Sequence, residues 1–575
     1  MKPKQLQKLA FPGGSLRRKV ARRALIKLGL RSTAVAGYYN TWVNQQGDGS
    51  QLHVQLKGIS KGPLISVIIP AYNPPPAYFE ELIYSVISQA YQNWELILIN
   101  ASSQARSKAT INDCKLKDKR IRVFEVENNG ISVNTNYGIK LAKGDYVAFV
   151  DHDDVLEPFA LYEVALAIID SGAELIYTDE DKISENGEIY FDPHFKPDWS
   201  PDLLTHVNYI NHLSVIKKSL ILRAGLLDPA KDGAQDYDLI LRVTDLSPKI
   251  VHVPKVLYHW RSAQNSTAQD FSSKKNITDA GQKSLEEHFE RQGLSVKAKP
   301  KKDSPGFYEL KFQPYKRVSL VIAPFASDAF LRLYTMMLLE RTSLDNIQVE
   351  MIVPTGGVQP NIKEGNLKIT SIDVGSNFLE QAVDLVNDTY VVIISQVILP
   401  LQKDWLERLC GPLCQKHIAS VAPLVIRNSS MIEDCGLVRD ATGQLRPLFM
   451  NRPSFPNQTF FGNPGWVRDV DALTGSVVAT STKPLRQFIE NNKGISYIPS
   501  LLRIFTEESA KMGKFNIIYT EVLLDNYAIR LKPDLPQSTL FNPNIFPIGS
   551  DYELCTPEAS AINILTIIAE QTEKQ

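Results

Sequence analysis

GDYVAFVDHDD, residues 144–154, decides the fold of the first half of this 575-residue chain. A strand-length apolar run ends here directly in a cluster of carboxylates. Two earlier runs, LISVIIP (64–70) and WELILI (94–99), are mainly apolar and continuous, which is typical of strands covered on both faces. Between them, apolar residues of 79–90 recur at helical spacing. This alternation predicts an α/β fold with a mostly parallel sheet, whose ligands bind at the carboxyl ends of the strands.

The same pattern returns in the second half. VSLVIAP (318–324) and NIQVEMIV (346–353) echo the first two strands at separations of 253 to 255 residues, and DTYVVIISQVILP (388–400) echoes the third at 244. This self-similarity predicts two copies of one fold, at 61–300 and 315–575. The charged, proline-containing tract around 296–316 predicts a linker between them.

The first 60 residues differ from the rest. The first 32 contain ten Lys or Arg, and the first acidic residue is Asp48. Apolar residues recur at helical spacing between positions 16 and 30, which predicts a basic helix. Two interpretations stay open: the helix lies on an anionic membrane surface, or it packs on the body of the protein with its basic face solvated.

Composition narrows the class of protein. With 43% apolar and 22% charged residues, the chain is expected to be globular. Its 63 basic and 63 acidic side chains give no overall attraction to nucleic acid. We expect no membrane-spanning helix, because no run of 18 apolar residues occurs. The five scattered cysteines favour a reducing compartment, so we expect a cytoplasmic protein, peripheral on the inner face of the plasma membrane if the basic helix binds there.

Six motifs, taken in order, resemble those of bacterial family 2 glycosyltransferases of the GT-A fold, especially enzymes that build O-antigen and other surface polysaccharides. The resemblance covers about residues 61–270 and implies tandem GT-A, Rossmann-like domains after a basic helical segment. It also implies an inverting, metal-dependent hexosyltransferase that moves a sugar from a nucleoside diphosphate donor to a growing, lipid-linked surface glycan. The motifs are SVIIPAYN, DHDD, YTDEDK, FDPHFKPDWSPDLL, GAQDYDLILR and VPKVLYHWR.

The resemblance implies a Mn²⁺ or Mg²⁺ site made by Asp151, Asp153 and His259. Carboxylates suit such a cation when it must also hold phosphate oxygens. Crowded carboxylates repel one another unless a cation or water screens them. The alternatives are an exposed acidic loop that caps a helix before Pro158, and a histidine with a purely structural role.

Asp236 matches the general base of the family. In an inverting transfer, a carboxylate on the acceptor side takes the proton of the attacking hydroxyl. Asp238 lies about 200° further round a helix, so we expect only one of the pair to face the site. Either could instead cap the helix that begins here. The resemblance assigns the nucleotide to Pro70, Tyr72, Asn100 and Asp151, and the donor and acceptor sugars to Asp154, Asp179, Glu180, Asp181, Gln235, Asp238 and Trp260.

The sequence departs from the family pattern in two places, and these departures leave a second function open. Asn100 stands where relatives usually carry an aspartate. In the second copy, Ser395 and Val397 fall at the positions of Asp151 and Asp153, with Asp525 opposite His259, so 315–575 is expected to be degenerate and architectural. The segment ALTGSVVATSTKPL (472–485) leaves glycan binding open. The alternative function is a non-catalytic glycan- or nucleotide-binding scaffold.

Overall fold

The computed structural model describes residues 62–526 with short gaps, together with two strands, β25 (Ile545–Ile548) and β26 (Asp551–Leu554). The basic segment 1–60, and with it the expected membrane contact, lies outside the described residues. Within the described residues no helix is both long and apolar enough to cross a membrane. The internal gaps are 263–270, 303, 305, 314–316, 325–327, 356–361, 376, 428–430, 441, 452–453, 455–463 and 494.

The first sheet is built from elements between residues 65 and 262. These elements are β1 (Ile65–Ala71), α4 (Pro76–Ile87), β2 (Trp94–Asn100), α5 (Ala105–Asp113), β3 (Ile121–Glu125), α6 (Ile131–Leu141), β4 (Tyr146–Phe149), β5 (Val155–Leu156), α7 (Ala160–Ser171), β6 (Leu175–Ser184), β7 (Tyr190–His194), α8 (Pro201–Leu204), β8 (Ser214–Lys217), α9 (Lys218–Ala224), α10 (Gln235–Thr244) and β9 (Ile250–Ser262). The strand order is β3-β2-β1-β4-β8-β6-β9-β5, with β7 paired to β6. β1 to β4 pair in parallel, whereas β8 runs antiparallel to both neighbours.

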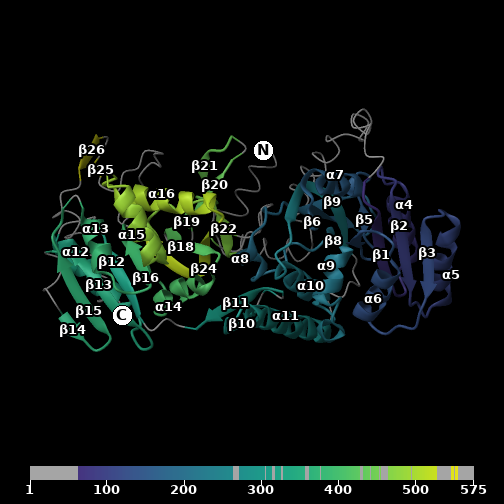
Figure 1. Cartoon of the computed structure of the whole chain (residues 1–575), viewed down its shortest axis with the longest axis horizontal. Coiled ribbons are helices and arrows are strands. Elements are labelled where there is room, and N and C mark those ends of the chain that lie inside the picture. Colours follow the sequence, from purple (N-terminus) through teal and green to yellow (C-terminus); the bar gives the residue numbers. More distant parts are fainter. Residues whose placement is uncertain are drawn as a thin grey trace, which may run out of the picture.

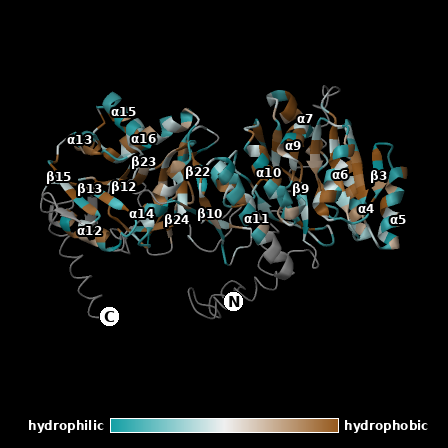
Figure 2. Ribbon diagram, turned by 60° about the horizontal axis from the view of Figure 1, so that its bottom comes forward, coloured by the Kyte–Doolittle hydropathy of each residue, from teal (hydrophilic) through white to brown (hydrophobic). Residues whose placement is uncertain are grey.

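Strand β1 shows why its sequence is continuously apolar. Ile65, Val67 and Ile69 point into the core on one face of the sheet, and Ile68 points into the core on the other. Successive side chains of a strand alternate between faces, so a strand covered on both sides is mainly apolar, and its buried Ser66 donates a hydrogen bond to Glu95 at 2.7 Å. Figure 2 shows hydrophobic residues concentrated in the strands of both sheets.

The second sheet repeats this topology. Its elements are β12 (Arg317–Ile322), α12 (Asp328–Glu340), β13 (Gln348–Pro354), β14 (Ile362–Glu364), β15 (Leu367–Ile372), α13 (Phe378–Leu385), β16 (Tyr390–Ile394), β17 (Ile398–Pro400), α14 (Trp405–Cys410), β18 (Ile418–Arg427), β19 (Met431–Asp434), β20 (Leu437–Arg439), β21 (Leu445–Pro447), β22 (Arg468–Val470), β23 (Val477–Ser481), α15 (Thr482–Asn491), α16 (Ile498–Lys511) and β24 (Phe515–Asn526). The order β15-β13-β12-β16-β23-β18-β24-β17 corresponds strand by strand to the first sheet. β14 is added at the edge and β22 beside β24, whereas β20 and β21 form a separate two-stranded ribbon.

Strand register matches as well as strand order. Ser66 of β1 lies beside Glu95 and Val147, and Ser319 of β12 lies beside Glu350 and Val391. These pairs have the separations found in the sequence, and both central sheets mix parallel and antiparallel strands in the same way. The expected tandem α/β architecture is therefore confirmed. Figure 1 shows the two sheets at opposite ends of the long axis of the molecule.

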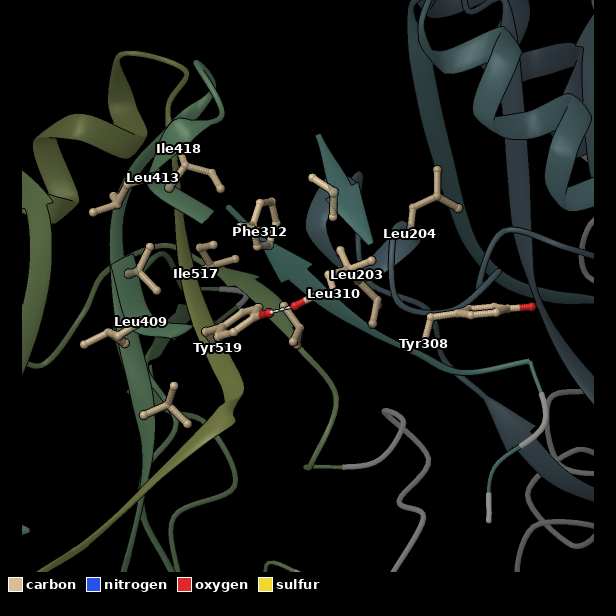
Figure 3. Packing of buried hydrophobic residues seen from close by; sticks show 14 of the residues in the cluster. Leu203, Leu204, Tyr308, Leu310, Phe312, Leu409, Leu413, Ile418, Ile517 and Tyr519 are labelled. Atoms are coloured by element: carbon tan, nitrogen blue, oxygen red, sulfur yellow. Dashed lines mark hydrogen bonds between the residues drawn. The ribbon is translucent and has the colours of Figure 1, made fainter. Parts of the chain in front are cut away.

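The tract 296–316 was expected to be a linker, and this expectation is wrong. β10 (Val296–Pro300) pairs antiparallel with β11 (Tyr308–Phe312), forming a ribbon next to helix α11 (Phe271–Arg291). The lysines of the ribbon are exposed and alternate with buried apolar side chains. Buried ribbon residues such as Leu310 pack in a core shared by both sheets (Figure 3), and Tyr519 Oη donates a hydrogen bond to the Leu310 carbonyl at 2.9 Å.

The ribbon predicts a stability effect that a linker would not have. We expect Leu310→Ala to lower the free energy of unfolding by about 2–5 kcal/mol, because it leaves a cavity in the shared core. Urea denaturation of the full chain measures this change. Lys311→Ala, on the exposed face of the same strand, is the control and should stay within about 0.5 kcal/mol of the wild type. Equal free energies of unfolding for Leu310→Ala and Lys311→Ala would show that Leu310 does not pack in a core shared by both sheets.

Candidate active site

Asp151 and Asp153 lie in the loop that follows β4, at the carboxyl ends of the parallel strands. The Asp151 side chain is 45% exposed, and one of its carboxylate oxygens lies 3.6 Å from Nε2 of His212. Asp153 is more deeply placed, and burial together with repulsion from the Asp151 carboxylate raises its pKa. A bound cation would relieve the repulsion that Asp151 exerts on the charge of Asp153.

Asp154 has a different role from the one expected. Its side chain is fully buried, where it accepts hydrogen bonds from Tyr258 Oη at 2.5 Å and from the Arg261 amide at 2.8 Å. Arg261 Nε donates in turn to the Asp153 carbonyl at 2.8 Å. Asp154 therefore anchors the loop to β9, and its carboxyl group faces the interior rather than a donor or acceptor sugar.

His259 lies in a clamp of two carboxylates. Its Nδ1 is 2.5 Å from Asp181 Oδ1 and its Nε2 is 3.1 Å from Glu157 Oε1. Burial alone would lower the pKa of His259, but the two carboxylates outweigh burial and raise the pKa to about 10. A pKa this far above neutrality favours the imidazolium, which has no lone pair for a metal. The arrangement therefore favours the structural role of His259 over the metal-ligand role, and Asp181 belongs to the clamp.

Lys196 similarly engages the two acids that precede Asp181. Its ammonium group is fully buried and lies 3.1 Å from Glu180 Oε2, while Asp179 Oδ1 accepts from the Lys196 amide at 2.8 Å. Asp179 Oδ1 is also 2.9 Å from Nε2 of His252. The acids of the YTDEDK motif therefore have partners inside the protein, and their expected contact with sugars stays a prediction.

Asn100 also faces inward. It is 1% exposed, and its side-chain amide donates to the Lys108 carbonyl and to Asn112 at 3.2 and 3.1 Å, while its oxygen accepts from the Ser102 amide at 3.2 Å. These bonds shape the turn after β2 and engage the groups expected to read a nucleotide. Tyr72, by contrast, is 48% exposed at the end of β1, close to the half-buried Pro70.

Asp236 occupies the first turn of α10. Gln235 Nε2 donates to its Oδ2 at 3.0 Å, and Gln235 Oε1 accepts from the Gly233 amide at 2.7 Å, so Gln235 orients the carboxylate. Burial and the charge of Asp151 raise the pKa of Asp236 to about 6. Asp238 instead pairs with Arg242 at 2.5 Å on the other side of the helix, which contradicts its expected place near the sugars.

His212 is a site residue that the sequence analysis missed. Its ring stacks on Tyr258, with centroids 4.8 Å apart, and meets Trp260 edge to face at 5.7 Å. Trp260 is 45% exposed, so the two rings form an aromatic corner beside Asp151. The only signal in the sequence is a lone histidine just before β8, a position that does not distinguish a site residue from a structural one.

Comparison with known proteins identifies the family. Residues 66–226 match the family model described as "Glycosyl transferase family 2". This region is a family 2 glycosyltransferase domain. The chain is 40% identical over 288 residues to the uncharacterized protein y4gI of Sinorhizobium fredii, an alignment that covers 48% of this chain and 32% of that protein. It is 29% identical over 436 residues to the O-antigen biosynthesis protein RfbC of Myxococcus xanthus. That alignment covers 73% of this chain and 34% of RfbC.

The chain thus spans about a third of the length of each of these two relatives. Among solved structures, S. aureus TarS in complex with UDP-GlcNAc is similar at 18% identity and a TM-score of 0.31, covering 40% of this chain and 73% of that one.

The second sheet lacks the acids of the glycosyltransferase domain. Register places Asp525 opposite Leu399, as His259 lies opposite Val155, so the expected position of Asp525 is confirmed. Ser395, at the position of Asp151, donates its hydroxyl to the Gly475 carbonyl at 2.7 Å. Helix α16 has no acidic residue in its first turn, whereas α10 has two there.

The His259 clamp predicts a pH-dependent stability of the glycosyltransferase domain. The pKa of His259 is about 10 in the folded chain and about 6.5 in the unfolded chain. The stabilisation is therefore fully present below about pH 6.5 and is lost as the pH rises toward 10. We expect the difference in unfolding free energy between wild type and His259→Gln to shrink from pH 7 to 10 in urea titrations.

An Asp181→Asn background supplies the control for this prediction. There the dominant carboxylate of the clamp is gone, so the effect of His259→Gln should vary much less over the same pH range. A difference that stays constant in the wild-type background would show that His259 is not held as a cation.

Proposed function

We propose that the chain is an inverting, metal-dependent glycosyltransferase that moves a sugar from a nucleoside diphosphate donor to a growing surface polysaccharide. The proposal rests on one observation: at the carboxyl edge of the first sheet, some acids are bound by partners inside the protein and others are not. Asp154, Asp181 and Asp238 are engaged by partners inside the protein. Burial and the charge of Asp151 both raise the pKa of Asp236, so these two acids act on each other across the site.

Asp151 and Asp153 suit a Mn²⁺ or Mg²⁺ ion that shares its remaining positions with phosphate oxygens and water. Both cations prefer oxygen ligands, and one or two carboxylates plus substrate phosphates are a usual set for Mg²⁺. Such a cation, when bound, would neutralise the charge of the departing nucleoside diphosphate. His259 has no place in this set, because Asp181 and Glu157 occupy both of its nitrogens.

Asp236 is proposed as the general base. With a pKa of about 6, it is ionised at neutral pH yet basic enough to take the proton of an acceptor hydroxyl. Gln235 engages its Oδ2, which leaves Oδ1 for the acceptor. The hydroxyl oxygen then attacks the anomeric carbon opposite the departing nucleotide.

The acceptor is proposed to be a lipid-linked O-antigen or similar surface glycan. The alignment of 73% of this chain with a protein of O-antigen biosynthesis supports this class of acceptor. The ten basic residues among the first 32 favour assembly at the anionic inner face of the plasma membrane.

Two substitutions test the proposed roles. We expect Asp236→Asn to lower the transfer rate by roughly 10²- to 10⁴-fold while nucleotide binding persists. Asp153→Asn should weaken Mn²⁺-dependent binding of nucleoside diphosphates by at least roughly tenfold. Asp170→Asn, at an exposed position of α7, is the matched control. Metal-dependent nucleotide binding with no sugar transfer to any acceptor would favour the scaffold alternative.

The proposed base also predicts a pH profile. Because burial and Asp151 raise the pKa of Asp236 to about 6, the fraction of active base falls as the pH drops through 6. We expect kcat/KM to rise from pH 5 to 7 and then reach a plateau. Its apparent pKa should be no higher than about 6, because burial still raises the pKa of Asp236 whereas a cation on Asp151 offsets the charge of that carboxylate. Initial rates in buffers of constant ionic strength measure this profile, and a rate that does not change between pH 5 and 7 would exclude Asp236 as the base.

A further inference from the structure

Residues 194–212 of the first domain lie against the second domain. At the start of this segment, the His194 ring meets Trp466 edge to face at 5.8 Å, and Trp466 also contacts Phe307 at 5.3 Å. Further along, the His206 ring meets Tyr519 at 5.9 Å. The second domain therefore contacts this segment with aromatic side chains at two places.

A buried polar cluster joins the middle of the segment to the second domain. Ser200 Oγ donates to Asp469 Oδ2 at 2.5 Å, and Asp202 lies 3.1 Å from Nε2 of His417 and 3.3 Å from Nε2 of Gln415. Burial and the Asp202 carboxylate raise the pKa of Asp469 well above its usual value, whereas His417 keeps Asp202 ionised despite burial. A proton shared by this pair is therefore favoured on Asp469. Separating these groups would leave charge buried without a partner, so the cluster holds the segment firmly.

The far end of the segment reaches the proposed active site. Lys196 Nζ donates to the carbonyls of Asn211 and His212 at 2.8 and 2.5 Å. These bonds fix the backbone from which the His212 ring extends toward Asp151 and Trp260. The segment is thus tied at one end to the second domain and at the other to the aromatic corner of the site.

We propose that the second domain is a positioning element for the acceptor subsite of the first. Trp466, Asp469 and His417 hold residues 194–212, and Lys196 transmits this order to His212, which with Trp260 offers an aromatic face to a sugar ring of the acceptor. This inference rests on the proposed transferase function. Strands β1 and β2, which lead to the expected nucleotide site, lie on the side of the first sheet away from the second domain (Figure 1). The interface should therefore affect binding of the acceptor more strongly than binding of the nucleotide.

Hydrogen–deuterium exchange on the full chain tests the physical link. Trp466 is only half-buried, so Trp466→Ala is expected to fold. We expect peptides from 194–212 to exchange roughly 3- to 10-fold faster in this variant, because an aromatic contact is lost. Tyr497→Ala, which truncates an exposed aromatic elsewhere in the second domain, is the matched control and should leave these peptides unchanged.

Kinetics and binding test the functional consequence. In Trp466→Ala we expect the KM for the acceptor to rise at least fivefold, with the donor KM and the Mn²⁺-dependent affinities for UDP, GDP and dTDP within twofold of wild type. Trp466→Phe should restore the acceptor KM, and Asp469→Asn, which keeps a neutral group at that position, should leave it nearly normal. Equal loss of nucleotide and acceptor binding, or an unchanged exchange rate in 194–212, would overturn the inference. If Trp466→Ala speeds hydrogen exchange in 194–212 but the wild-type chain transfers no sugar to any acceptor, the proposed function is rejected while the physical link between the domains stands.

Discussion

Carboxylates crowd the carboxyl edge of the first sheet, and the need to compensate each of them organises the site. A buried carboxylate must find a cation or hydrogen-bond donors, or take up a proton. Asp181 is met by His259, Glu180 by Lys196, and Asp154 by Tyr258 and the backbone. These internal pairs link β6 to β9 and to the segment after β7. What is left for chemistry is the smaller group formed by Asp151, Asp153 and Asp236.

The same principle explains the second domain. Its sheet has the same order and register, but serine and apolar side chains stand where the first sheet has acids. Such positions need neither a bound cation nor a set of internal counter-charges. This difference agrees with the architectural role expected for the second domain, in which its surface supports a neighbour. Tyr519 and Leu310 illustrate this support, since their hydrogen bond lies in a core that both domains share.

Much of the fold could be predicted because it depends on local periodicity. The apolar runs identified strands, and their repetition identified the second copy with its register. The site was only partly predictable. Asp151 and Asp153 were proposed from their position at a strand end, and Asp236 from the family resemblance. The pairing of Asp181 with His259 joins strands far apart in sequence, so no local pattern could predict it. The ribbon at 296–312 was missed because its lysines conceal the alternating apolar side chains.

The central claim is that Asp151 and Asp153, without His259, provide the protein ligands of a catalytic cation. Anomalous X-ray diffraction at the manganese edge, from crystals of the full chain soaked with Mn²⁺ and UDP, tests it directly. The account predicts an anomalous peak within about 2.3 Å of an oxygen of Asp151 or Asp153, with His259 still between Asp181 and Glu157. A peak bonded to a nitrogen of His259, or one remote from both aspartates, would contradict it.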